Sequence, residues 1–274
     1  MTTLTPESLR TTSTPHQKSH LIRAEWTKLR TVRSTWWTLS AMVLVTLGVA
    51  SIAGASVSHS WTTFNVIQRA TFDPTGISLK GLLFSQLIIG VLGVLVMSAE
   101  YGTGTIRSTL AATPQRTRVL IAKAGVVGAL SLVVGEVLSF GAFFLGQSLL
   151  RSPAPHAQLS QPHVLQAVVG GGVVIGLLGL FALGIATLIR HSAGAITTYV
   201  GILLVVPIIL QTLPSSFSQP ILKFMPFHIS DVMTSTVTVG QGSSLSPWVG
   251  AGVLALYAFG TLAVGGYLLR RRDA

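Results

Sequence analysis

The chain of 274 residues has little charge and no cysteine. Only 9% of its residues are charged, whereas a soluble domain usually has about 25%. A soluble core of this length would need a more strongly charged shell, so the composition argues against a soluble protein. Because cysteine is absent, the chain can form no disulfide, no cysteine–metal site and no thiol nucleophile.

Several catalytic motifs are also missing from the sequence. It has no G-x-x-x-x-G-K-[ST] phosphate loop, no H-E-x-x-H zinc motif and no G-x-S-x-G nucleophile turn. Gly102 and Gly104 form a G-x-G pair, but the third glycine of a dinucleotide-binding fingerprint is lacking and an apolar run precedes the pair instead of a strand. We therefore expect a protein that is not an enzyme and that holds no nucleotide or metal of its own.

Long apolar runs dominate the chain. Hydrophobic residues make up 49% of it, and the mean hydropathy is +0.67. A helix needs about 20 mostly apolar residues to cross the hydrocarbon core of a bilayer. Six runs meet that length and predict an all-α integral membrane protein with six transmembrane helices, at Trp36–Val57, Leu79–Ser98, Lys123–Leu149, Val164–Ile189, Ala193–Leu213 and Trp248–Leu269.

The lysines and arginines are distributed unevenly about these runs. Of the 18, all but four lie before the first span, between the second and third, between the fourth and fifth, or after the last; the four are Arg69, Lys80, Arg151 and Lys223. Cytoplasmic loops carry the excess of positive charge, so both termini are predicted to be cytoplasmic, in a multi-pass protein of the cell (plasma) membrane. This distribution accounts for the net charge of +11 without a nucleic-acid partner.

The residues before the first span divide into a tail and a helix. Residues 1–19 are rich in Thr, Ser and Pro and are predicted to be a disordered cytoplasmic tail, leaving residues 20–274 as one transmembrane domain. His20–Ser34 is predicted to form an amphipathic helix in the membrane interface, with Trp26 and Leu29 on its apolar arc and Lys28 nearby. Glu25 interrupts that arc, which favours contact with protein over contact with lipid alone.

The connection between the second and third spans, Ser98–Lys123, is more ordered in pattern than a plain loop. Glu100 follows the apolar run, and two glycines permit a turn. Thr105 is then placed to cap a short helix, Ile106–Ala112, which Pro114 ends. About seven helical residues are not stable alone in water, so this helix is expected to dock on another protein.

Three features of the later spans carry further predictions. The connection Pro214–Pro247 contains the apolar stretch Ile221–Val232, which predicts a short helix or a shallow re-entrant hairpin on the outer membrane face; the alternative is a surface loop. Gly172 and Gly176 match the close-packing motif of membrane helices, and Pro207 predicts a kink in the fifth span.

Glu136 is the one acid deep within a predicted span. A charge at the bilayer centre costs about 2.5–3.5 kcal/mol on insertion scales, so Glu136 should face protein or water, or be protonated. It borders a stripe of small residues that predicts a helix-packing seam and includes Gly128, Gly135 and Gly146. Three roles remain open for its carboxyl group: fixing a helix pair, lining a transport path, or coupling to protons.

Two segments resemble the ABC-2 family, the membrane permease subunits of one class of ATP-driven exporters. The stretch AEWTKLRTVRSTWWTL is similar to the interface helix that leads into the family's first span. The stretch EYGTGTIRSTLAATPQRTRVLIAK resembles its signature segment, in which Glu100, Gly104, Thr105, Leu110, Pro114, Arg118 and Lys123 hold the matching places.

The resemblance implies that two permease subunits, identical or different, pair in the membrane and that each docks on a separate ATPase subunit, which would bind the ATP and Mg²⁺. Membrane lipid is the remaining partner. The resemblance also implies that Thr105–Thr113 is the coupling helix. The residues implied in coupling are Glu100, Gly104, Thr105, Ile106, Arg107, Leu110, Pro114 and Arg118. Arg107 stands where many relatives have an acid.

The residues alone leave two other classes of function open. One is a secondary carrier or channel that uses Glu136 directly. The other is a structural or sensing membrane subunit that transports nothing.

Overall fold

A computed structural model of the chain describes residues 15–105, 116–237 and 244–271, and all of the regular elements in these ranges are helices. The short connections include one 3₁₀ turn, Trp61–Thr63, and the fifth span includes one π-helical turn, Gly201–Val205. The α-helices are α1 (Pro15–Thr31), α2 (Arg33–Ser60), α3 (Val66–Ala70), α4 (Pro74–Leu79), α5 (Leu82–Gly102), α7 (Arg116–Leu149), α8 (Val164–Ile189), α9 (Ser192–Val200), α10 (Val206–Gln211), α11 (Ser215–Leu222), α12 (Pro226–Thr234) and α13 (Pro247–Arg271).

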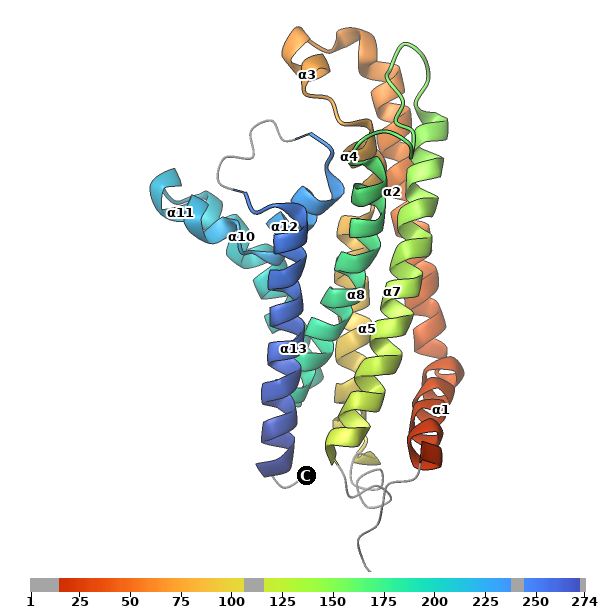
Figure 1. Cartoon of the computed structure of the whole chain (residues 1–274), viewed down its shortest axis with the longest axis vertical. Coiled ribbons are helices and arrows are strands. Elements are labelled where there is room, and N and C mark those ends of the chain that lie inside the picture. Colours follow the sequence, from red (N-terminus) through yellow and green to blue (C-terminus); the bar gives the residue numbers. More distant parts are fainter. Residues whose placement is uncertain (1–14, 106–115, 238–243, 272–274) are drawn as a thin grey trace, which may run out of the picture.

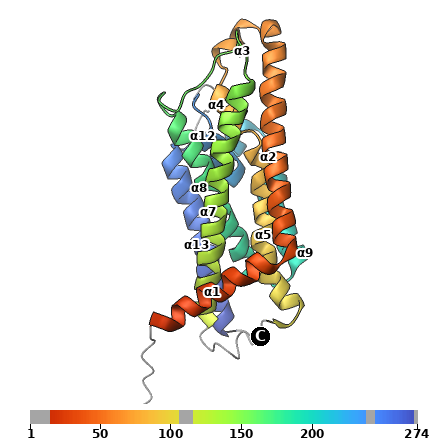
Figure 2. The ribbon, with the colours of Figure 1, turned by 90° about the vertical axis from the view of Figure 1, so that its right-hand side faces the viewer.

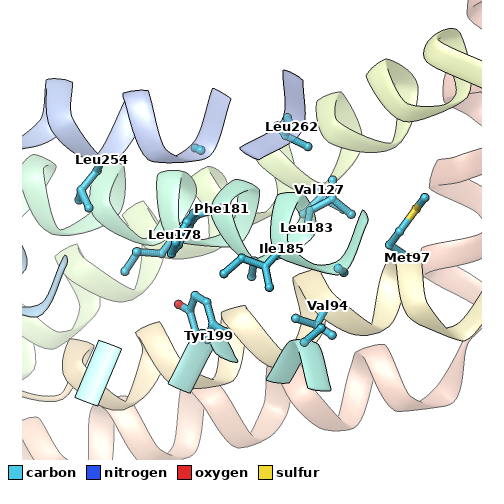
Figure 3. Packing of buried hydrophobic residues seen from close by; sticks show 14 of the residues in the cluster. Val94, Met97, Val127, Leu178, Phe181, Leu183, Ile185, Tyr199, Leu254 and Leu262 are labelled. Carbon is cyan, nitrogen blue, oxygen red and sulfur yellow. The ribbon is translucent and has the colours of Figure 1, made fainter. Parts of the chain in front are cut away.

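The long helices run side by side as an elongated bundle (Figure 1). At one end, called the basic end, α1 lies, α5 ends, α7 begins and α13 ends; α3 and α4 lie at the opposite end, called the far end. The helix α8 is the most buried of the spans and packs against α5, α7 and α13. Its Leu178 and Phe181 join Tyr199, Leu254 and other buried residues in the main core (Figure 3).

Within the described residues, six helical segments are long and apolar enough to cross a membrane, which confirms the predicted all-α architecture with six spans. The fourth span has the predicted bounds. The third begins at Arg116 instead of Lys123, because the α-helix includes the basic residues that precede the apolar run. The first and sixth spans are likewise a few residues longer than their apolar runs, at Arg33–Ser60 and Pro247–Arg271.

The second span is interrupted near its start. It begins with α4, which Asp73 caps by accepting hydrogen bonds from the backbone N–H groups of Thr75 and Gly76. A two-residue turn, Lys80–Gly81, with right-handed helical dihedral angles separates α4 from α5. Gly81 lies against α2, where a Cβ at this position would stand 2.2 Å from the carbonyl oxygen of Thr46. The predicted start, Leu79, is therefore the last residue of α4 and not the start of a helix.

The fifth span contains the predicted irregularity at Pro207. Because proline has no backbone N–H, it cannot complete the α-helical hydrogen bond to the preceding turn. The turn before it, Gly201–Val205, is π-helical, and α10 then continues to Gln211. The distortion thus lies just before the proline, and the span has two helical halves.

The segment between the fifth and sixth spans has two short helices, α11 and α12. The side chains of Ile229, Val232 and Met233 in α12 are buried, and α12 packs against α8 and α13. Asp73 also holds the chain after α12, since its carboxylate accepts hydrogen bonds from Ser235 and Thr236 at 2.6–3.0 Å. The apolar stretch in this segment is therefore part of the bundle.

The helix α1 crosses the basic end at a steep angle to the spans (Figure 2). It occupies Pro15–Thr31, so the predicted bounds of 20–34 are wrong at both ends and residues 15–19 belong to the helix. Proline is well suited to the first position of a helix, which explains the earlier start. Val32 has an extended backbone (φ −78°, ψ 117°) and separates α1 from α2.

Candidate functional site

Four charged side chains from three helices form a ring of ion pairs at the basic end. The Lys123 Nζ atom of α7 lies 2.6 Å from Oε2 of Glu25 in α1 and 2.9 Å from Oε1 of Glu100 in α5. The Lys28 Nζ atom of α1 lies 3.0 Å from Oε1 of Glu25 and 2.9 Å from Oε1 of Glu100. Each lysine thus contacts both carboxylates. We call these four residues the charge ring.

Local helix geometry explains how α1 contributes to the ring. Glu25 and Lys28 are three residues apart, a spacing that places two side chains on neighbouring positions of one helix face. Leu29, four residues after Glu25, is buried beside them. Trp26 and Ile22 of the predicted apolar arc are about half exposed, whereas Leu29 of the same arc is buried, so only part of the predicted face contacts the protein. The side of α1 that contacts the protein contains Glu25 and Leu29. Glu25 is held there by its buried ion pair with Lys123.

The ring is electrically balanced and mostly out of solvent. The side chains of Lys123, Glu25 and Glu100 are 2%, 7% and 12% exposed, while that of Lys28 is 47% exposed. Two cations face two anions, so the ring as a whole carries no net charge. Removing one partner from a buried pair typically costs about 3–5 kcal/mol, because the remaining charge is left uncompensated. Lys123 is therefore the member whose loss should disturb the fold most.

Lys28 closes the ring at its solvent side. Burial by itself lowers the pKa of this lysine, but the hydrogen bonds and charges of Glu100 and Glu25 outweigh burial and raise its pKa above the ordinary value. Lys28 thus stays charged at neutral pH and gains from both carboxylates. It is the ring member through which the cluster meets solvent.

Glu100 stands close to the C-terminus of α5, where the helix dipole is unfavourable for an anion. Its pairing with two lysines offsets this placement. Two residues later α5 ends, and Gly104 takes a left-handed conformation (φ 71°) that glycine adopts without strain. The chain leaves the bundle there, through the exposed residues Gly104 and Thr105.

The ring spans the base of the connection predicted to be the coupling helix. That connection leaves α5 just after Glu100 and returns in α7, seven residues before Lys123. Arg118 lies in the first turn of α7 and is partly buried. Four residues predicted to act in coupling, Ile106, Arg107, Leu110 and Pro114, lie outside the described residues.

A second contact ties the end of α5 to the junction of α8 and α9. Tyr101 follows Glu100, and the guanidinium carbon of Arg190 lies 5.3 Å from the centre of its ring, within range of a cation–π contact. Arg190 itself has a left-handed backbone (φ 60°) between the fourth and fifth spans. The end of α5 therefore contacts both α1 and α7 through Glu100, and the α8–α9 junction through Tyr101.

The ring also forms one wall of a cavity of about 540 Å³ between α1, α2 and α5. The remaining lining is mostly apolar, with Leu92, Leu95 and Val96 from α5, and includes hydroxyl groups of α2 such as Thr35 and Thr38. These features make the cavity amphipathic and place its charged wall at the basic end.

Glu136 lies apart from the ring, in α7 against α8. A Cβ added to Gly172 would stand 2.3 Å from Cδ of Glu136, so the carboxyl group occupies the space above that glycine. The neighbouring stripe faces the same helix: Gly135 contacts Ile175, and the Ser139 hydroxyl donates to the Val168 carbonyl at 2.6 Å. These contacts confirm the predicted packing seam. The role of Glu136 in a transport path stays a prediction.

Lys123 is the ring residue that sequence reasoning placed at the start of a span and in the signature segment, but in no charged cluster. One signal was available, since a lysine that directly precedes a long apolar run lies at the edge of a span, where an anionic partner would stabilise it. The sequence offered Glu25 and Glu100 as partners but gave no distance between them, because residues 98 apart are brought together only by packing.

Comparison with known protein families shows which family the chain belongs to. A family model described as ABC-2 family transporter protein matches residues 21–207. The chain belongs to this family. None of the curated proteins compared with the chain matches it. The family match covers α1 from Leu21, all four residues of the charge ring and the chain as far as Pro207, and it confirms the predicted resemblance to ABC-2 permeases. With its six apolar spans, the chain is a multi-pass membrane protein of an ABC-transporter family.

Proposed function

We propose that this chain is the permease subunit of an ATP-driven exporter of the cell membrane, and that it couples to a separate ATPase through the connection between α5 and α7. In this proposal the segment Thr105–Thr113 docks on the ATPase. Two permease subunits together form the path for the cargo. ATP and Mg²⁺ bind to the ATPase, because this chain has no phosphate loop.

The observation that carries the proposal is the charge ring at the base of this connection. A docking segment can transmit movement only if its ends are fixed to the elements that must move. Glu100 and Lys123 fix the two ends to each other at 2.9 Å, and Glu25 attaches α1 to the same point. A displacement of the segment would therefore move α1, α5 and α7 together.

The proposed sequence of events follows from that connection. ATP binding in the ATPase would shift the docked segment, and the ring would pass the shift to the ends of two spans. Long helices packed side by side move as rigid bodies, so a shift at the basic end would change their arrangement along their length. The path formed with the second permease subunit would then open alternately to the two sides of the membrane.

The docking step is tested by affinity purification of the full chain from its native membranes. We expect a companion protein that contains a phosphate loop and hydrolyses ATP. The double variant Ile106→Asp with Leu110→Asp should lose this ATPase, because two acids would replace the apolar side chains predicted to contact it. The amount of each variant that reaches the membrane is measured in parallel.

A matched control uses two apolar residues at the far end. Val66 and Ile67 of α3 are 84% and 74% exposed, so Val66→Asp with Ile67→Asp makes the same chemical change without disturbing the core. The control should retain the ATPase. If the variant at 106 and 110 also retains it and supports ATP-dependent transport at the full rate, the coupling proposal is wrong.

A carrier that uses Glu136 is the second candidate, because this carboxyl group lies within a span and between two helices. Such a carrier would depend on an ion gradient and would need no nucleotide. Transport into sealed vesicles, measured with ATP alone and with a proton gradient alone, separates the two candidates.

A further inference from the structure

A groove of about 690 Å³ runs between α7 and α13 near the basic end. Small residues line both sides, among them Gly125 and Gly128 of α7 and Gly266 of α13, and Leu180 of α8 lies beneath them. The groove faces outward, because the adjoining side chains of Ile121 and Phe259 are 65% and 58% exposed. A Cβ on Gly125 would meet nothing within 4 Å, so the space beside this residue is open.

The length of the groove matches one leaflet of a bilayer. Its wall on α7 runs from Thr117 to Gly128, and its wall on α13 runs from Phe259 to Arg270. Eleven residues of α-helix rise about 16 Å on either wall. This is roughly half of the 30 Å hydrocarbon core. A helix from a second copy of the chain would cross the whole core, whereas an acyl chain crosses one leaflet only.

The basic end of the groove carries arginines. Arg270 lines it and donates from Nε to the Thr117 hydroxyl at 2.7 Å, which joins the two walls. The next residue, Arg271, has its guanidinium carbon 4.7 Å from the centre of the Tyr267 ring, and Tyr267 also lines the groove. Arginine binds phosphate through its planar fork of N–H groups, and basic pockets between membrane helices bind anionic headgroups.

We propose that this groove is a binding site for an anionic phospholipid of the leaflet at the basic end. One acyl chain lies along Gly125, Gly128 and Gly266, and the phosphate is bound by Arg270 with Arg271. The site faces away from the charge ring, which uses α1, α5 and a different face of α7. Its occupant is therefore structural or regulatory lipid, and its binding does not depend on the ATPase.

The test is native mass spectrometry of the purified full chain in detergent, titrated with phosphatidylglycerol or phosphatidylcholine. We expect a preference of about tenfold for phosphatidylglycerol, which corresponds to the strength of one charge-assisted contact. Gly125→Leu fills the groove and should weaken binding of phosphatidylglycerol about tenfold. Arg270→Gln should remove the preference while leaving binding at the level of phosphatidylcholine.

The matched control is Gly252→Leu, on α13 but outside the groove, where a Cβ also meets nothing within 4 Å. It should bind both lipids as the unaltered chain does. The proposal is overturned if Gly125→Leu binds phosphatidylglycerol as the control does. It is also overturned if Gly125→Leu changes the ratio of monomer to dimer without changing lipid binding, since the groove would then be an interface between copies. Displacement of the lipid by equimolar free glycerol phosphate would overturn it as well, because the site would then recognise phosphate alone.

Discussion

Lys123 donates a hydrogen bond to Glu25 at 2.6 Å, although 98 residues separate the two in sequence. The contact joins the helix that precedes the first span to the start of the third span. The amphipathic pattern of α1 would by itself place this helix on the membrane surface. Through Glu25 this helix becomes part of the bundle, at the point where the predicted coupling connection is anchored.

The first prediction compares the two lysines of the charge ring. Lys123→Met leaves two buried carboxylates with only the half-exposed Lys28 as a partner and should lower the free energy of unfolding by about 3–5 kcal/mol. Lys28→Met removes a lysine that is 47% exposed and should cost less than about 1 kcal/mol. Thermal unfolding of both purified variants in the same detergent measures the difference. Equal losses would show that the ring does not work as a buried cluster.

The second prediction separates docking from coupling. Glu100→Gln keeps the size of the side chain but removes the charge that both lysines contact. The ATPase should still bind, because its proposed docking segment is unchanged. ATP-dependent transport should fall by about tenfold, in the range typical of a coupling free energy between two sites. Asp231→Asn, at an exposed acid of α12, is the control and should transport normally.

Transport by Glu100→Gln at the normal rate, in protein that carries a normal amount of ATPase, would contradict this role. Loss of the bound ATPase would contradict it in a different way, since Glu100 would then shape the docking surface itself.

The spans could be predicted from the sequence because hydropathy is a local property. Every residue of an apolar run contributes to the signal. The fourth span, whose helix ends where its apolar run ends, has both of its predicted bounds, Val164 and Ile189. The interruption of the second span at Lys80–Gly81 could not be predicted in this way. It depends on the approach of Gly81 to Thr46, and a hydropathy window averages over such a contact.

The candidate site was only partly predictable for a related reason. Glu25, Lys28 and Glu100 were singled out from local patterns and from the resemblance to ABC-2 permeases. Their contacts with Lys123 join residues that are far apart in the sequence, and the periodicity of a single segment cannot predict such contacts. The lipid groove was missed because Gly125 lies off the stripe of small residues that packs against α8, so its empty surroundings are visible only in three dimensions.

The third prediction concerns the contact between α2 and the Lys80–Gly81 turn before α5. Gly81→Ala would place a Cβ 2.2 Å from the Thr46 carbonyl oxygen, and a backbone atom in a packed helix cannot easily move away. We expect a loss of about 1–3 kcal/mol in the free energy of unfolding, as for other overpacked sites. Gly48→Ala, on the same α2 helix, meets nothing within 4 Å and should be neutral or stabilise by up to about 1 kcal/mol. Thermal unfolding compares the pair, and a stable Gly81→Ala variant would mean that the second span is not held tightly against α2 at this turn.

The fourth prediction decides whether the carboxyl group of Glu136 takes part in transport. Glu136→Gln retains the length of the side chain and its contact above Gly172 but cannot carry charge or release a proton. If the residue serves packing, ATP-dependent transport and expression should both equal those of the unaltered chain. Gly172→Ala provides a second variant, because its Cβ would push the Glu136 side chain away while leaving its carboxyl group chemically unchanged. Since the end of a glutamate side chain can rotate, this variant should also fold. Loss of ATP-dependent transport in both variants, at normal levels in the membrane, would show that Glu136 serves more than packing and would place it on the cargo path.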